Sequence, residues 1–371
     1  MNRPHAHAGL IVVGEDCGLK YRIKNWLELS VFTENLGKML DDGLMFDKAF
    51  DIAGRDLASS TNRRLVADLK EVFLGHGKAE EVLARYQLPQ FYLALFRCGE
   101  LTGRWPKALR DAAGFTHQLA PVIYRLHRCW LFVGAAYLIS VIFKWVFLAQ
   151  PQYLTLAVLA IIFLLPLCSE TFRYWRDWLT AKLPFIGTWQ KQLALMQFFV
   201  CLEIAYDSTL SVREMFLNSI SAIDNRFLRR QMLRSVNCID ERQSFAASLR
   251  AVPFIPPGVS ALVHTHEIGG RLADCFHELS SQLKKIVEAK LEVLKYFSAG
   301  IAISAGVFFP LLLILPYIVP KSALWAASLI ILYMMGFVPI ACARAAFRQY
   351  RAKSAGLNLW YERLRGNKVD Y

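Results

Sequence analysis

Two stretches, Gly99-Glu100-Leu101-Thr102-Gly103-Arg104 and His266-Glu267-Ile268-Gly269-Gly270-Arg271, carry nearly the same pattern 167 residues apart. Their glutamates align with each other, as do the glycines that follow three residues later. Each stretch lies near the end of a polar region that runs into a pair of long apolar segments. Self-similarity over such a distance indicates an internal duplication. The sequence therefore predicts two copies of one module, each followed by apolar segments.

The chain is rich in apolar segments of the length that crosses a membrane. It has 371 residues, of which 55% are hydrophobic, and its mean hydropathy is +0.31. The excess is concentrated in four segments almost free of charge, at 130–148, 153–168, 297–319 and 324–343. A helix needs roughly 20 apolar residues to cross the hydrocarbon core of a bilayer. We therefore expect about four transmembrane helices, although 153–168 is short enough to be a buried core helix instead.

Positive charge flanks the predicted spans on one side only. The links between paired spans carry at most one charge, that of Lys321, within an overall net charge of +13. The other ends of the spans carry the basic residues Arg125, Arg128, Arg173, Arg176, Lys290, Lys295, Arg344 and Arg348. By the positive-inside rule, both termini and both polar regions are cytoplasmic. Nucleic-acid binding is the rival explanation for the basic charge, but the charge is dispersed and no binding motif accompanies it, so we expect no nucleic-acid partner.

Both polar regions have the apolar periodicity of helices. In the first, apolar residues at three- and four-residue steps predict helices over about 25–40, 45–54, 59–73 and 89–101. A short helix that ends at about residue 86 and another that begins at residue 105 are also expected. In the second, the expected helices lie at 193–204, 212–220, 227–236, 244–249 and from about 258 through Glu267. Phe32 aligns with Phe198, and Phe50 aligns with Phe216, 166 residues apart. Neither region contains a β-rich run of strand length, so we expect an all-α, polytopic membrane protein with two homologous cytoplasmic helical bundles.

These patterns predict six consecutive segments. They are an N-terminal cytoplasmic segment (1–24), a first cytoplasmic bundle (25–128), two transmembrane helices (130–168), a second bundle that repeats the first (173–296), two further transmembrane helices (297–343) and a basic cytoplasmic tail (344–371).

Over about residues 25–345 the chain resembles the inner-membrane platform proteins of type II secretion and type IV pilus systems, the type II secretion F-domain family. The family pattern is a phenylalanine-led first helix, a glycine turn, and an acidic-glycine element. Here these are Phe32, Asp42-Gly43-Leu44 and Gly99-Glu100-Leu101-Thr102-Gly103. The second copy departs from this pattern, because Thr209 replaces the turn glycine and His266 replaces the glycine before Glu267. Together with four expected spans where the family usually has three, these departures suggest a divergent member of the type IVb or conjugative thin-pilus kind.

The resemblance implies a protein that performs no chemistry and binds no cofactor. It implies an assembly platform in the bacterial inner membrane that couples a cytosolic assembly ATPase to the extraction and polymerisation of pilin or pseudopilin subunits. The implied partners are that ATPase, pilin or pseudopilin transmembrane helices, other inner-membrane pilus or secretion components, the lipid bilayer and further copies of the chain. A membrane-anchored receptor or regulator with helical cytoplasmic interaction domains is the alternative.

The repeated element supplies the candidate structural or partner-binding residues. Glu100 and Glu267 are placed to accept backbone N–H groups of the next helix, which would lock the turn between helices, or to contact a partner protein. Gly103 and Gly270 suit a backbone with positive φ at a helix end. Gly43, at which the first helix is expected to break, is a further candidate because it is the turn glycine of the family pattern.

Two other motifs are too incomplete to indicate chemistry. His264 and His266 are two residues apart, so they diverge on a helix and do not form the His-Glu-x-x-His arrangement of zinc enzymes. Gly75-His76-Gly77-Lys78 lacks the upstream glycine and the hydroxyl residue of a phosphate-binding loop. We therefore expect no catalytic, cofactor-binding or metal-binding residues.

The third predicted span has small residues at the spacing that allows close helix packing. Ala302 and Gly306 are four residues apart, which places them on one face of a helix. We expect this face to pack against another helix, within one chain or between subunits.

We predict that Gly306→Leu reduces assembly of the complex and leaves membrane insertion intact, because a larger side chain keeps the two helices apart. Crosslinking of membranes and counting of assembled fibres would measure the effect. Unchanged crosslinked oligomers together with normal fibres would contradict it.

Overall fold

The computed structural model describes residues 23–75, 79–86, 88–118, 122, 170–182, 186–206, 208, 210–241, 243–318 and 341. Every regular element within these residues is a helix, which confirms the all-α class. The predicted spans at 130–148, 153–168 and 324–343 lie outside the described residues, apart from residue 341. So do the segment 1–22 and the basic tail. Among the described residues, no helix has the length and apolar character required to cross a bilayer, and the four spans stay predictions.

The helices of the first half agree with the periodicity of the sequence. They are α1 (Ile23–Asp41), α2 (Phe46–Ala53), α3 (Ser60–Phe73), α4 (Ala79–Arg85) and α5 (Gln90–Thr102), followed by a helix over residues 105–118. Each begins within a few residues of the position that capping and turn residues indicated. The apolar stripes face inward, because Leu29, Phe32 and Leu36 of α1 are all buried.

The second half contains α8 (Glu170–Lys182), α9 (Ile186–Tyr206), α10 (Val212–Ser221), α11 (Arg226–Met232), α12 (Arg234–Asp240), α13 (Phe245–Arg250), α14 (Pro257–Ile268) and α15 (Leu272–Ile318). Two differences from the expected helices are evident. The sequence indicated one helix over 227–236, whereas the chain breaks at Leu233 into α11 and α12. The apolar spacing continues across this one-residue break, so periodicity does not reveal it. Helix α8 was not expected.

The two halves present their helices in the same order. From α2 onward, each helix in the first half has a counterpart that begins 166 or 167 residues later, with α11 and α12 together matching α3. An aromatic contact is repeated with the helices: the rings of Phe32 and Phe50 lie 5.9 Å apart, and those of Phe198 and Phe216 lie 5.6 Å apart. Corresponding residues therefore form corresponding contacts. The division of the chain into two homologous bundles stays a prediction.

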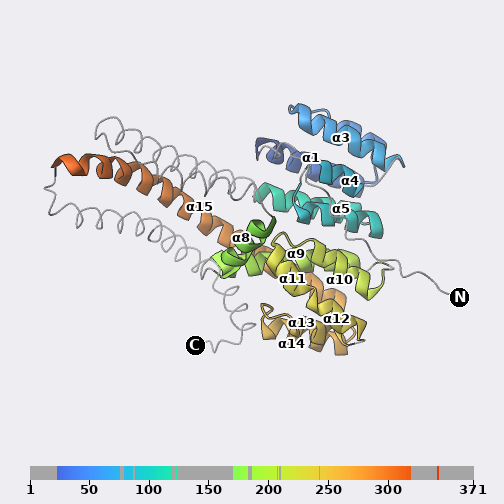
Figure 1. The fold of residues 1–371 in the computed structure, drawn as a ribbon. Helices are drawn as coiled ribbons and strands as arrows, with labels where there is room; N and C mark the ends of the chain where they lie inside the picture. The colour runs from blue at the N-terminus through green and yellow to red at the C-terminus, as the bar shows by residue number, and fades with distance from the viewer. Residues whose placement is uncertain are drawn as a thin grey trace.

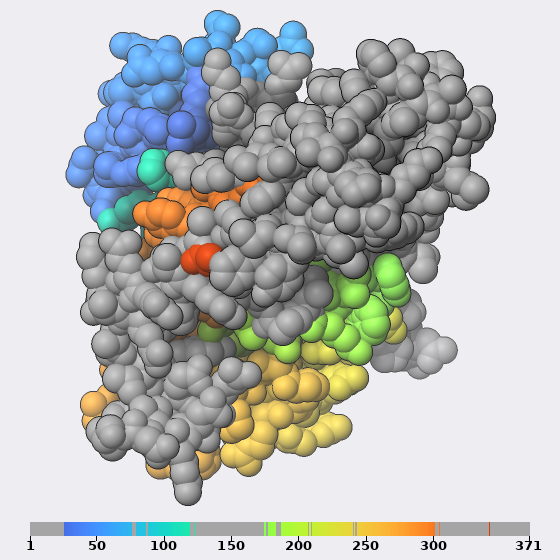
Figure 2. Space-filling model, turned by 90° about the vertical axis from the view of Figure 1, so that its left-hand side faces the viewer, coloured from blue at the N-terminus to red at the C-terminus, as the bar shows by residue number. Residues whose placement is uncertain are grey.

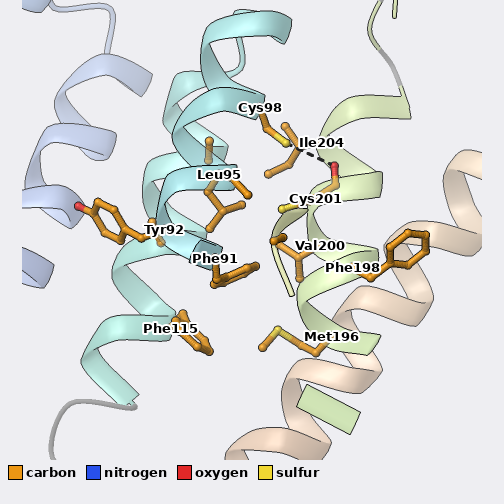
Figure 3. Close-up of a cluster of buried hydrophobic side chains, with 14 of the residues drawn as sticks. Phe91, Tyr92, Leu95, Cys98, Phe115, Met196, Phe198, Val200, Cys201 and Ile204 are labelled. Carbon is orange, nitrogen blue, oxygen red and sulfur yellow. Dashed lines mark hydrogen bonds between the residues drawn. The ribbon is translucent and has the colours of Figure 1, made fainter. Parts of the chain in front are cut away.

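The halves pack directly on each other through α5, α9 and α10 (Figure 1). Figure 3 shows α5 and α9 side by side, with Phe91, Leu95 and Cys98 on the side of α5 that faces α9. Tyr92 points to the opposite side of α5, where its hydroxyl lies 2.5 Å from Thr33 Oγ1 of α1. The buried residues of both halves consequently form one continuous hydrophobic core.

Helix α15 extends from this core to one side of the molecule (Figure 1). It has 47 residues, and Cys275, Phe276 and Leu279 near its start are fully buried. The helix runs without interruption past residue 296, where we placed the boundary between the second bundle and the membrane. The backbone of the third predicted span is thus helical through Ile318.

A glycine in the repeated element allows two helices to pack closely. A Cβ at Gly99 would lie 2.8 Å from Cε3 of Trp105, which is closer than real Cβ contacts allow. The Trp105 ring in turn contacts Phe46, Phe73 and Phe96. In the second copy His266 takes the place of Gly99, and Leu272 takes the place of Trp105.

We predict that Gly99→Ala lowers the free energy of unfolding by about 1–3 kcal/mol, because the new methyl group displaces the Trp105 ring from its aromatic neighbours. Gly114→Ala is the matched control, since a Cβ at that helical glycine meets nothing within 4 Å. Thermal unfolding of both variants in detergent would measure the difference. Equal unfolding midpoints for the two variants would contradict the prediction that a methyl group at position 99 displaces the Trp105 ring.

Candidate functional site

The glycines of the repeated element terminate helices in left-handed backbone conformations. Gly103 has φ of 69° and ends α5, and Gly270 has φ of 66° and follows α14. After α14, the Arg271 N–H donates to His266 O and the Gly270 N–H donates to Glu267 O, which is a Schellman motif. Glycine is favoured there because a Cβ disfavours positive φ. Both glycines thus have a positive φ at the end of a helix.

Gly43 has the same role at the end of α1. Its φ is 81°, and the Leu44 N–H donates to Met39 O while the Gly43 N–H donates to Leu40 O. This is a second Schellman motif. Thr209, the counterpart of Gly43, lies outside the described residues.

Glu267 caps a helix, but not the one that its position suggested. Its two carboxylate oxygens accept the backbone N–H groups of Phe245 at 2.9 Å and Ala246 at 3.3 Å. These residues open α13, the preceding helix, whereas we expected the following one. Side chains on a helix lean toward its N-terminus, so a residue near the end of α14 reaches back to its neighbour. Glu267 therefore holds α13 and α14 together.

The other candidate residues are dispersed. Glu100 lies on the exposed side of α5, in its last turn. Ala302 and Gly306 lie one turn apart in the α15 helix. The structure therefore does not bring the candidate residues into one site.

A buried carboxylate that we did not anticipate joins the two halves. Glu203 of α9 has a side chain only 6% exposed, and its Oε1 lies 2.6 Å from Lys107 Nζ of the 105–118 helix. The same oxygen lies 2.7 Å from His277 Nδ1 of α15, and Oε2 accepts the Ser280 hydroxyl. Both oxygens are thus satisfied, as a buried carboxylate requires. One side chain connects three helices.

The surroundings of Glu203 favour its ionised form. Burial raises the pKa of this carboxyl group, but the hydrogen bonds from Lys107, Ser280 and His277 together outweigh burial, and the net pKa lies below its ordinary value. The carboxylate is therefore charged at neutral pH, and the Lys107 ammonium balances its charge.

Two further pairs continue this connection toward the predicted membrane. Lys284 Nζ lies 2.6 Å from Asp111 Oδ1, and Gln118 Nε2 donates to Glu288 Oε1 at 2.6 Å. We call the three connections, Lys107–Glu203–Ser280, Asp111–Lys284 and Gln118–Glu288, the inter-helix ladder. Residue numbers increase along both helices from one connection to the next, so the 105–118 helix and α15 run parallel. Both helices lead to predicted spans.

The apolar contact between α5 and α9 also contains polar groups. Asn218 Nδ2 of α10 lies 3.0 Å from Cys98 Sγ of α5, and the Cys98 thiol points to the carbonyl oxygen of Cys201 at 3.8 Å (Figure 3). Burial, the largest cause, and the neighbouring Cys98 raise the pKa of the Cys201 thiol. The Cys201 thiol therefore stays protonated and acts as a packing group.

Asp224 adds a further contact between the two halves, at the start of α5. Its carboxylate accepts Gln197 Nε2 at 2.6 Å and the backbone N–H groups of Phe91 and Gln90. A carboxylate at this position caps α5 from the other half of the chain. Burial is the largest influence on this group and leaves its pKa above the ordinary value in spite of these hydrogen bonds.

The sequence contains one signal for this interface. Glu203 is the single acidic residue within the long apolar stripe of α9. A charge in a buried stripe requires a partner, so it indicates contact with another element. Its partners lie 74 to 96 residues away in the chain, and spacing alone does not identify them. Within the described residues, no group of three or more His, Cys, Asp or Glu side chains is arranged to hold a metal ion.

Fold and interface together define an all-helical scaffold whose two halves are fastened by buried polar contacts. Residues 204–320 match the family model described as type II secretion system (T2SS), protein F. This part of the chain is therefore similar to the protein F family of type II secretion systems. No curated protein matches the chain.

We predict that Glu203→Gln lowers the free energy of unfolding at neutral pH by about 1–3 kcal/mol, because the Lys107 ammonium loses its partner. The folded-state pKa of Glu203 lies below its ordinary value of 4.5. The stabilisation is therefore complete above that pH and is lost as the pH falls through the folded-state pKa. Unfolding midpoints of wild type and variant should thus converge in acid.

Glu34→Gln is the control, because the Glu34–Lys38 pair has the same 2.6 Å separation but both side chains are largely exposed. An exposed pair of this kind contributes about 0–1 kcal/mol. A Glu203→Gln variant that is no less stable than the control at neutral pH would contradict the interpretation.

Proposed function

We propose that this protein is an inner-membrane assembly platform that couples a cytosolic assembly ATPase to the extraction and polymerisation of pilin or pseudopilin subunits. The family match over residues 204–320 supports the class of protein. The observation that carries the mechanism is the continuity of α15, which begins in the core of the second half and continues through the third predicted span.

Because α15 is unbroken, it transmits motion along its whole length. At 1.5 Å per residue, α15 is about 70 Å long. Its first turns are fixed by packing, since Phe276, Leu279 and Leu283 are buried against the rest of the second half. A displacement of the second half by the ATPase therefore moves the whole helix, including the part proposed to lie in the membrane.

The inter-helix ladder extends this coupling to the first half. It holds the 105–118 helix parallel to α15 through Lys107–Glu203–Ser280, Asp111–Lys284 and Gln118–Glu288. The 105–118 helix leads toward the predicted span at 130–148. The spans that follow the two halves would then move together, and a pilin transmembrane helix would meet them as one surface.

In this function both halves lie in the cytoplasm as two copies of one helical module. The ATPase binds a cytoplasmic surface of these modules, and pilin or pseudopilin transmembrane helices contact the spans. Further copies of the chain and other inner-membrane components complete the complex. The repeated order of helices and the repeated Phe–Phe contact support the duplication.

The Asp111–Lys284 pair provides a test, because its charges can be exchanged. We predict that Asp111→Lys or Lys284→Asp alone reduces fibre assembly or secretion at least tenfold, since like charges then face each other across the ladder. The double variant should recover much of the activity. Lys38→Glu is the control, because it reverses a charge in an exposed pair.

Protein levels in the membrane and co-purification with the ATPase and pilin should be measured for each variant. Normal fibre assembly or secretion in both single variants would contradict the coupling mechanism. Failure of the wild-type chain to co-purify with either partner would contradict the proposed function itself.

A further inference from the structure

Helix α8 lies on the side of the molecule toward which α15 projects (Figure 1). It begins at Glu170, two residues after the end of the predicted span at 153–168. The projecting part of α15 includes residues 297–318, which belong to another predicted span. Both α8 and α15 therefore connect the second half to predicted spans.

One face of α8 is held against the second half. The ring of Tyr174 contacts that of Phe227 at 6.0 Å, and Ala181 is only 3% exposed. Asp177 Oδ2 accepts the Arg226 N–H at 3.2 Å, and the Asp177 carbonyl oxygen accepts Asn225 Nδ2 at 3.2 Å. These contacts fix which residues of α8 face outward.

The outward face combines aromatic, apolar and basic side chains. Trp175 is 52% exposed and Leu179 is 41% exposed. The Trp175 and Trp178 rings stack at 6.2 Å, and Lys182 Nζ lies 4.3 Å from the centre of the Trp178 ring. Figure 2, viewed from the side to which α15 projects, shows the green segment that includes α8 at the surface.

This combination suits the boundary between lipid and water. Tryptophan has an apolar ring and a polar N–H group, and it is enriched at the headgroup level of membranes. A lysine beside it can extend its ammonium to lipid phosphates while its methylene chain stays in the apolar layer. Helices with one such face lie in the plane of the interface.

We propose that α8 lies in the phospholipid headgroup layer, with Trp175, Leu179 and Lys182 turned toward lipid. This inference rests on the membrane location in the proposed function. Because α8 packs on both α9 and α11, its contact with lipid fixes the orientation of the second half relative to the membrane. The site is a lipid-binding surface and not a protein-binding one.

The test uses the full chain in bilayer discs of phosphatidylethanolamine and phosphatidylglycerol. A photoreactive p-benzoylphenylalanine replaces Trp175 in one variant and Leu179 in a second. The matched control carries it at Ile268, which is 77% exposed at the end of α14. After illumination, mass spectrometry measures the fraction of chains with a covalently attached phospholipid. A variant is compared only if it elutes as the wild type does.

We expect lipid attachment at positions 175 and 179 to exceed that at 268 at least fivefold. Attachment no greater than at position 268, or crosslinks to a second copy of the chain in its place, would overturn the proposal. The assay contains neither ATPase nor pilin. Lipid attachment without co-purification of these partners would therefore leave α8 at the lipid surface and refute the platform function alone.

Discussion

A carboxylate removed from water must be paired, and in this chain the pairing of Glu203 holds three helices in one arrangement. Its oxygens contact Lys107, His277 and Ser280, so the first half, α9 and α15 meet at one side chain. Apolar packing alone would allow the halves to slide on each other, because it is not directional. Fixed pairs such as Asp111–Lys284 select a single register. The remainder of the interface, including the α5 cap by Asp224, depends on that register.

The two occurrences of the repeated element differ in their side chains. In the first, Gly99 lies against Trp105, whereas in the second His266 and Leu272 stand at the corresponding positions. The glycines with positive φ, Gly103 and Gly270, are retained. The backbone conformation after the helix is thus the same in both occurrences, whereas the neighbouring residues differ.

The helices, their order and the turn glycines could be predicted from the sequence, because they depend on local apolar periodicity and backbone conformation. The inter-helix ladder could not, since Lys107 and Asp111 look like ordinary surface charges until their partners on α9 and α15 are known. Glu267 shows an intermediate case: capping was predictable, but the helix that it caps depends on how α13 packs beside α14. The break at Leu233 is also a tertiary feature, because the apolar spacing is the same on both sides of it.

The uninterrupted length of α15 has a geometric consequence. A rigid rod of about 70 Å is a lever, and a tilt of about 5° at its packed end shifts the far end by about 6 Å. That shift is comparable to one helical turn, the step by which one helix slides past another in register. A small rotation of the second half can thus displace the far end of α15 by about one helical turn. A flexible joint along the helix would absorb that rotation.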